Sequence, residues 1–390
     1  MRRMSRAAAQ KAYRKLSLPT TSDEGWRFTD LTGFDPDAYE LAGAARTVEI
    51  EPLVELDLAG SARIDESGVE IVAAPEGVVF APLKKKDKRI GALIKARDKI
   101  AVANVAFWKH GLLVEVPAGV QLERPLHVRI ESTVPNGSLP TRLLVVAGEN
   151  SRFTLIEEHV SAADDLDALT NCAVEVHVGA EAKLELVSVQ RLSRRGWHFS
   201  RQHARLERDS QLDWVCAGLG SKKSKTWISN DLTGAGATSR VTGVYAADGS
   251  QHLDFDTYQE HAAPHTNSDF LFRGALRDEA TTVWRGMIRV EPEAQGTDAY
   301  QENRNLLLSR QAHVNSIPGL EILANDVRCS HGATVGQVDR AQLYYLMSRG
   351  MTESEAERLI VHGFFAEALD RIEREPIREA LAKALEARIP

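Results

Sequence analysis

The stretch CAVEVHVGAEAKLELVSVQ, residues 172–190, shows the pattern that governs most of this chain. Apolar and polar residues alternate on both sides of a short connection at Gly179. Because successive side chains of a strand point to opposite faces, this alternation predicts two β-strands joined by a tight turn. Similar segments recur from about Val105 to Val338, and clear helical windows are nearly absent there.

The turns of this region add a second regularity, a small residue that recurs about every thirty positions. A repeat of this length is typical of stacked coils, so we expect a β-helix or solenoid. A β-sandwich is the alternative, but two-residue Asn-Gly or Asp-Gly hairpin connections occur only at Asn136-Gly137 and Asp248-Gly249. The turn pairs are Asn150-Ser151, Gly179-Ala180, Asp209-Ser210, Gly236-Ala237, Glu279-Ala280, Gln311-Ala312 and Gly332-Ala333.

Composition narrows the classes of protein. The net charge of −7 gives no reason to expect a nucleic-acid partner, and no apolar run is long enough to cross a membrane. The three cysteines, Cys172, Cys216 and Cys329, are far apart and odd in number. Reduced thiols in a cytoplasmic protein are therefore expected rather than a disulfide framework.

The two ends of the chain differ from its middle. Residues 1–105 read as a mixed N-terminal domain with a basic first helix and a second helical stretch around Lys84–Arg97. Residues 106–340 form the predicted β-helix core, and residues 341–390 a helical C-terminal domain.

The C-terminal domain contains several helix signals. A short helix is expected at Gln342–Ser348, a capping box at Thr352–Glu355, and a last helix at Ile377–Ile389 behind Pro376. A helical tail of this size buries little surface alone, so it must pack on the solenoid or on another protein. The apolar positions expected to share one face of its middle helix are Ala356, Leu359, Ile360, Phe364, Leu369 and Ile372.

Several motifs resemble sites without completing them. The segment Gly218–Thr226 lacks the glycine that a phosphate loop has before its lysine, so we expect no nucleotide to bind this chain. His261 and His265 have zinc-like spacing but lie in a strand-and-loop region, where they need not share a face. Asp254 and Asp256 could serve as paired carboxylates of a carbohydrate-active enzyme, and acidic surface residues are the simpler interpretation.

Cys329 and His331 are the remaining candidate site residues. They lie within the segment Leu320–Arg349, where the β pattern changes to a helical one. Residues two apart in a strand point to the same side, so thiol and imidazole could meet one ligand. A nearby imidazolium would favour the thiolate. A buried cysteine beside a hydrogen-bonded histidine is the alternative, while Cys172 and Cys216 are interpreted as core residues.

These residues carry a family resemblance. The stretch PGLEI with NDVRCSHGATVG, residues 318–336, resembles the SufB/SufD family of iron–sulfur cluster assembly proteins, as do LMSRG at 346–350 and VHGFF at 361–365. The segment GWRFTDL, residues 25–31, is similar to an N-terminal motif of the SufD branch. Further matches lie at 265–269, 272–274 and 284–286, so the resemblance extends over almost the whole chain.

The resemblance implies a right-handed parallel β-helix between helical terminal domains. It implies pairing with a SufB-like subunit through the β-helix, and docking of a SufC-like ABC ATPase on the C-terminal helices. It also places Cys329 and His331 at the interface that holds a transient iron–sulfur cluster. We therefore expect His331 to be an iron ligand or to orient a thiolate, with Cys329 in a supporting role.

The resulting expectation is a non-enzymatic scaffold subunit that forms a homodimer when isolated. Two alternatives remain: a purely structural partner without a ligand role, and a carbohydrate-active β-helix enzyme. Deletion of residues 341–390 is expected to abolish ATPase binding and leave the solenoid folded.

Overall fold

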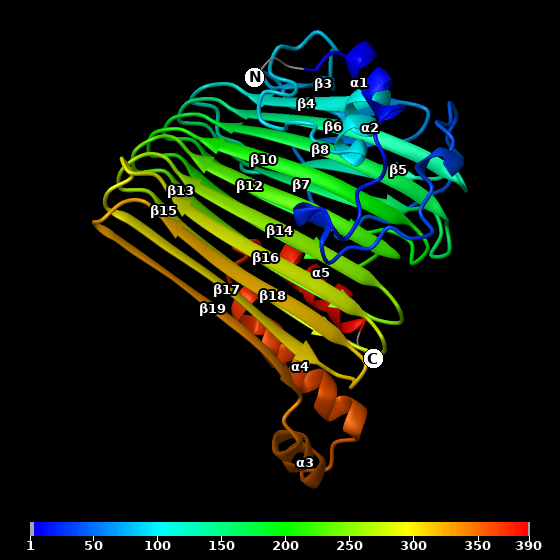
Figure 1. The fold of residues 1–390 in the computed structure, drawn as a ribbon, viewed down its shortest axis with the longest axis vertical. Coiled ribbons are helices and arrows are strands. Elements are labelled where there is room, and N and C mark those ends of the chain that lie inside the picture. Colours follow the sequence, from blue (N-terminus) through cyan, green and yellow to red (C-terminus); the bar gives the residue numbers. More distant parts are fainter. Residues whose placement is uncertain (1–3, 389–390) are drawn as a thin grey trace.

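A stack of β-strands fills most of the chain, with helices at both ends (Figure 1). The computed structural model describes residues 4–388. The strands of the stack are β4 (His110–Val116), β5 (Leu126–Ser132), β6 (Gly137–Ala147), β7 (Arg152–Ser161), β8 (Ala168–Val178), β9 (Lys183–Arg191), β10 (Trp197–Leu206), β11 (Gln211–Gly218), β12 (Lys223–Leu232), β13 (Thr238–Ala247), β14 (His252–His261), β15 (Asn267–Leu276), β16 (Thr281–Val290), β17 (Thr297–Leu307), β18 (His313–Ile322) and β19 (Val327–Gln337).

These strands form two facing parallel sheets. The odd-numbered strands from β5 to β19 pair in order in a ten-stranded sheet, and the even-numbered strands from β4 to β18 in a nine-stranded sheet. Each strand therefore pairs with the strand two positions away in sequence, in parallel register. This topology confirms the predicted β-solenoid and rules out the sandwich, which would need hairpin pairing.

The small residues at the turns have a common structural cause. Ser151, Ser210 and Ala237 each donate their backbone N–H to the residue three positions earlier, and their side chains are buried. The preceding residues Asn150 and Asp209 have positive φ, which asparagine and aspartate tolerate better than most residues. These turns thus close with a left-handed residue followed by a small buried one.

One member of the predicted turn series is wrong. Gly332-Ala333 lies inside β19 rather than in a turn. Gly332 has the hydroxyl of Tyr300 and the side chain of Glu302 as close neighbours on the adjoining strand, so a side chain there would be crowded. A small residue in this pattern therefore marks close packing as well as turns.

The space between the sheets is the main core, which we call the lumen. Along β7, Phe153 and Leu155 join the lumen cluster, whereas Ile156 belongs to a separate apolar cluster outside the ten-stranded sheet. The alternation seen in the sequence therefore separates lumen-facing from outward-facing side chains. Both faces of this sheet are apolar because helices cover its outer side.

The N-terminal region comprises α1 (Arg6–Tyr13), η1 (Glu24–Trp26), η2 (Pro36–Ala38), β1 (Gly60–Ile64), β2 (Val69–Ala73), β3 (Val79–Pro82) and α2 (Lys99–Phe107). Strand β1 pairs in parallel with β5 and in antiparallel with β2, while β3 pairs in antiparallel with β4. Trp26 and Phe34 pack on Trp197 and Phe199, so this segment covers part of the nine-stranded sheet.

The helix predicted at Lys84–Arg97 is wrong. The segment forms turns, and helix α2 begins only at Lys99, capped by the side chain of Asp98. Gly91 has a φ of +71°, which a right-handed helix cannot contain. The neighbouring lysines also repel one another at helical spacing.

The chain ends in α3 (Arg340–Ser348), α4 (Glu353–Leu369) and α5 (Glu375–Glu386). The predicted short helix is confirmed, the Thr352–Glu355 capping box is present, and Pro376 lies in the first turn of α5. Helix α5 ends before the predicted Ile389, which lies outside the described residues.

Helices α4 and α5 pack against the outer face of the ten-stranded sheet. The predicted apolar face of α4 is only partly right, because Leu359 is 45% exposed while Val361 and Phe365 are buried. The helix contacts the sheet through the row Val361, Phe365 and Ala368. Removing the tail would therefore expose an apolar sheet face, so the deletion is a poor test of ATPase docking.

Among residues 4–388, no helix has the length and hydropathy needed to cross a membrane.

Candidate functional site at the open end of the solenoid

Cys329 and His331 lie on the last strand of the ten-stranded sheet. In the parallel register of β17 and β19, Cys329 is next to Ala299 and His331 is next to Gln301. Both of these β17 neighbours are buried in the lumen, at 1% and 0% exposed. Cys329 and His331 therefore continue two lumen-facing rows at the end of the stack.

The end of the stack explains the different burial of the two side chains. Cys329 is half-buried beside an apolar cluster that includes Ile288 and Ala299. His331 is exposed because no further coil follows it within this chain. Gln301 bridges the lumen just behind, where its side-chain amide donates to the carbonyl of Gly319 at 2.9 Å.

The Cys329 thiol is not activated in this chain. Burial raises its pKa, and the nearby Asp298 carboxylate raises it further. The expectation that an adjacent imidazolium favours the thiolate is therefore wrong for this chain by itself, because desolvation opposes the charged form. The Asp298 carboxylate is paired with Arg328, at 2.9 Å.

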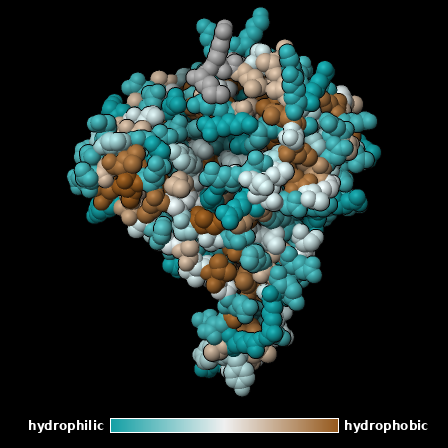
Figure 2. All heavy atoms as spheres, viewed as in Figure 1, coloured by the Kyte–Doolittle hydropathy of each residue, from teal (hydrophilic) through white to brown (hydrophobic). Residues whose placement is uncertain are grey.

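Both sheets end at this face. Strand β18 is the last of the nine-stranded sheet and β19 the last of the ten-stranded sheet. Large apolar side chains are exposed there, with Ile322 at 39%, Leu323 at 46% and Val335 at 42%. Figure 2 shows apolar side chains among hydrophilic ones over the region of β18. Such an edge can pair with a strand from another chain.

A second exposed surface lies on α3, which projects from the end of the stack in Figure 1. Tyr344 is 75% exposed, Tyr345 56% and Met347 40%. No residue of α3 is buried. Aromatic and methionine side chains of this kind are common at protein interfaces.

The two carboxylates considered for carbohydrate chemistry both form ion pairs with cationic side chains. Asp254 is buried, forms an ion pair with the Lys225 ammonium and accepts a hydrogen bond from the Thr29 hydroxyl. Asp256 forms an ion pair with the Arg285 guanidinium. Because the N-terminal segment covers them, these carboxylates do not line an open groove.

The two histidines with zinc-like spacing do not share a face. His261 is fully buried, and its ring nitrogens each lie 2.8 Å from a hydroxyl, of Thr266 and of Ser268. His265 is a turn residue with a φ of +58°. The ring of His261 therefore belongs to the lumen, whereas His265 lies in a turn.

The segment Gly218–Thr226 runs from the last residue of β11 into β12. It joins two strands, whereas a phosphate loop joins a strand to a helix whose N-terminus faces the phosphate. Its residue Lys225 is buried against Asp254.

A group that the sequence analysis missed lies inside the lumen. Glu157 and His159 of β7 and Cys172 of β8 bring an oxygen, a nitrogen and a sulfur atom within 4.8 Å of one another. Cys172 is buried, as expected of a core residue, and burial raises the pKa of its thiol. The sequence signal was a Glu-x-His pair at lumen-facing positions of an apolar strand.

Comparison with known proteins identifies the family. The model of the SUF system FeS cluster assembly SufBD core domain matches residues 129–364, which is more than half of the chain. The chain belongs to the SufBD family. The matched region runs from β5 into α4, so it contains the open end of the stack with the Cys329–His331 pair.

Curated relatives cover nearly the whole chain. An iron–sulfur cluster assembly SufBD family protein of Mycobacterium tuberculosis is 31% identical over 91% of each chain. The iron–sulfur cluster assembly protein SufD of Escherichia coli is 31% identical over 96% of this chain and 90% of its own. SufD of Bacillus subtilis is 27% identical over 95% and 89%. This SufBD protein is thus SufD-like in sequence, as its N-terminal motif predicted.

Proposed function

We propose that this chain is the SufD-like subunit of a cytoplasmic scaffold that it forms with a SufB-like subunit and a SufC-like ATPase. Membership of the SufBD family and similarity to proteins named SufD support this role. The chain itself then contributes a surface and ligands rather than catalysis.

The SufB-like partner pairs with the open end of the solenoid. The observation that carries this assignment is the ending of both sheets at one face, where β18 and β19 have free edges and exposed apolar side chains. Strand addition at such an edge gives backbone hydrogen bonds, and burial of Val335 and Ile322 gives apolar contact.

At this interface His331 serves as an iron ligand and Cys329 supports it. A neutral imidazole is a good iron ligand, and its exposed position lets a partner residue reach the same ion. The raised pKa of Cys329 fits a supporting role, since cluster ligation by sulfur requires the thiolate. The iron–sulfur cluster is cargo shared with the partner chain.

The SufC-like ATPase docks on the C-terminal helices. Helices α4 and α5 fix this unit to the ten-stranded sheet, and α3 presents Tyr344, Tyr345 and Met347 to solvent. In this arrangement nucleotide binds the ATPase and not this chain.

Two other assignments are weaker. A purely structural subunit would use the same open end but would not need His331 for cluster formation. A carbohydrate-active enzyme would need free acidic groups in a groove, whereas Asp254 and Asp256 are paired with cations. When the chain is isolated, the open end forms a homodimer.

The test is anaerobic co-purification of this chain with the SufB-like and SufC-like proteins, followed by iron and sulfide analysis. A stable complex containing iron and sulfide is expected. Recovery of the three proteins as separate species would contradict the proposal.

A further inference from the structure

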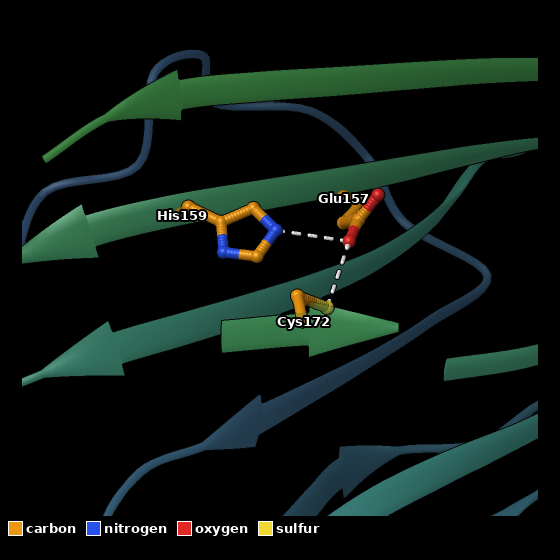
Figure 3. A group of neighbouring side chains, drawn as sticks. All are labelled: Glu157, His159 and Cys172. Carbon is orange, nitrogen blue, oxygen red and sulfur yellow. Dashed lines mark hydrogen bonds and ion pairs between the residues drawn. The ribbon is translucent and has the colours of Figure 1, made fainter. Parts of the chain in front are cut away.

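The lumen contains a polar group that lies between apolar residues of β5 and polar residues of β9. Glu157 and His159 are two apart on β7 and face the lumen, while Cys172 approaches from β8 on the facing sheet (Figure 3). All three are buried, at 0%, 2% and 1% exposed. In the adjoining strand β5, the register neighbours of Glu157 and His159 are Val128 and Ile130.

The donor atoms of this group converge on one point. His159 Nε2 lies 2.9 Å from Glu157 Oε1, and Cys172 Sγ lies 3.8 Å from the same oxygen. In a tetrahedral zinc site with usual bond lengths, such donors are about 3.3 to 3.6 Å apart. A shift of a few tenths of an ångström in these side chains therefore makes room for an ion between them.

The charges also match. A carboxylate and a thiolate together neutralise a divalent cation, and the imidazole ligates in its neutral form. Full neutralisation matters in the lumen because an uncompensated charge there is costly. The combination of one nitrogen, one oxygen and one sulfur ligand suits the borderline-soft transition metals, and zinc above all.

From this geometry we propose that Glu157, His159 and Cys172 bind a divalent transition metal of the zinc class inside the solenoid. On binding, the thiol proton of Cys172 is released to solvent as the sulfur–metal bond forms. The site is separate from the open end of the solenoid and does not rest on the function proposed for Cys329 and His331.

The surroundings leave room for a water beside His159 and support the ligand side chains. A cavity of about 20 Å³, room for one water, is lined by His159, Ser188 and Cys216. The Ser188 hydroxyl donates to Glu157 Oε2 at 2.9 Å, and Trp214 Nε1 donates to Ser188 at 3.2 Å. This chain of hydrogen bonds fixes the carboxylate as partners of metal ligands do.

Nδ1 of His159 is buried without a hydrogen-bond partner among the described residues. The cavity that His159 lines has room for one water. A water there that accepts from Nδ1–H would hold the ring with Nε2 toward Glu157 and Cys172, as partners of metal-ligating histidines do.

The test exploits the chain's three cysteines. The double variant Cys216→Ala, Cys329→Ser leaves Cys172 as the sole thiol, and the matched variant Cys172→Ser keeps the other two. Because the site is enclosed, each protein is refolded with Co²⁺, Zn²⁺ or Fe²⁺, desalted, and measured for bound metal. With Co²⁺ we expect one equivalent and a sulfur-to-cobalt charge-transfer band in the double variant, and neither in Cys172→Ser.

A second variant distinguishes loss of a metal ligand from loss of the fold. His159→Gln preserves polarity at that position, and its fold is checked by circular dichroism before metal analysis. We expect it to lose metal while it remains folded. The Zn²⁺ and Fe²⁺ arms show which ion is held after desalting. No bound metal in the folded double variant, or equal binding in Cys172→Ser, would overturn the proposal.

Discussion

The buried guanidinium of Arg273 on β15 donates to the carboxylate of Glu367 on α4 at 2.6 Å. The same Nη2 atom lies 2.6 Å from Glu302 of β17. Arg273 is 1% exposed, so one cation fastens the C-terminal helices to the solenoid and neutralises a buried acid in the next coil. The helices are thus held by charge as well as by their apolar row.

Replacing Arg273 should weaken the attachment of the C-terminal helices to the solenoid. We expect Arg273→Met to lower the free energy of unfolding by about 2 kcal/mol, because Glu302 loses its buried cation and keeps only Arg304 and the Tyr300 hydroxyl as partners. Glu367→Gln is the control, and it should cost less than about 1 kcal/mol because Glu367 is largely exposed. Urea unfolding measures both, and equal losses would show that Glu302 does not need Arg273.

Loss of the imidazole at the open end should impair cluster formation. In the reconstituted complex, we expect His331→Ala to weaken iron retention about tenfold or more, the usual scale for removal of a metal-site group. Ser330→Ala is the matched control, since its side chain lies on the opposite face of β19. Iron and sulfide content after desalting reports the effect. Full cluster content with His331→Ala would favour the purely structural subunit.

A charge on the free edge should block the partner. We expect Val335→Glu to weaken binding of the SufB-like protein at least about tenfold, because the carboxylate would be desolvated at the interface. Val72→Glu adds the same charge to β2, at the other end of the same sheet, where Val72 is 60% exposed. Titration calorimetry compares the two variants. Similar affinities would move the interface away from this edge.

Truncation of the two tyrosines of α3 should release the ATPase. We expect Tyr344→Ala with Tyr345→Ala to weaken SufC-like binding about tenfold or more, since exposed aromatic anchors carry much of an interface's energy. The fold should not change, because neither side chain is buried. Leu16→Ala, at an exposed position near the other end of the chain, is the control. Unaltered ATPase capture by the tyrosine variant would exclude α3 as the docking surface.

Acid should destabilise the solenoid through His261. Burial lowers its pKa to about 4, so the unfolded chain takes up this proton at a higher pH than the folded one. The free energy of unfolding that neutral His261 contributes is fully present above about pH 6.5. It decreases by about 3 kcal/mol as the pH falls to 4. His261→Gln should flatten the stability curve in that window. Urea midpoints at several pH values provide the check, and parallel curves would contradict the assignment.

Local patterns predicted much of the fold. Alternation gave the strands, the small turn residues gave the coil length, and Thr352 with Glu355 marked the start of α4. The pattern failed where tertiary packing decides which face of a helix is buried. Leu359 was predicted to lie on the packed face and Val361 was not, whereas Val361 contacts the sheet and Leu359 is exposed. The helix predicted for the lysine-rich segment before α2 is wrong because Gly91 adopts a left-handed conformation, which the neighbouring sequence does not reveal.

The candidate sites also differ in how far local sequence reveals them. Cys329 and His331 were identifiable because they are neighbours in one strand, and their role as cluster ligands stays a prediction. Glu157 and Cys172 lie on different strands of facing sheets, so their approach depends on coil length and sheet stacking. No local spacing encodes that distance. The pKa of Cys329 was misjudged because its burial comes from residues of other coils.

The shared end of the two sheets has a consequence for the supply of this subunit. Its two free edges can pair with a second copy as well as with a partner. Under the pairing proposed above, chain made in excess of its partner would be drawn into homodimers that cover these edges. The ratio of the two subunits would then set how much of this chain is free to enter the complex.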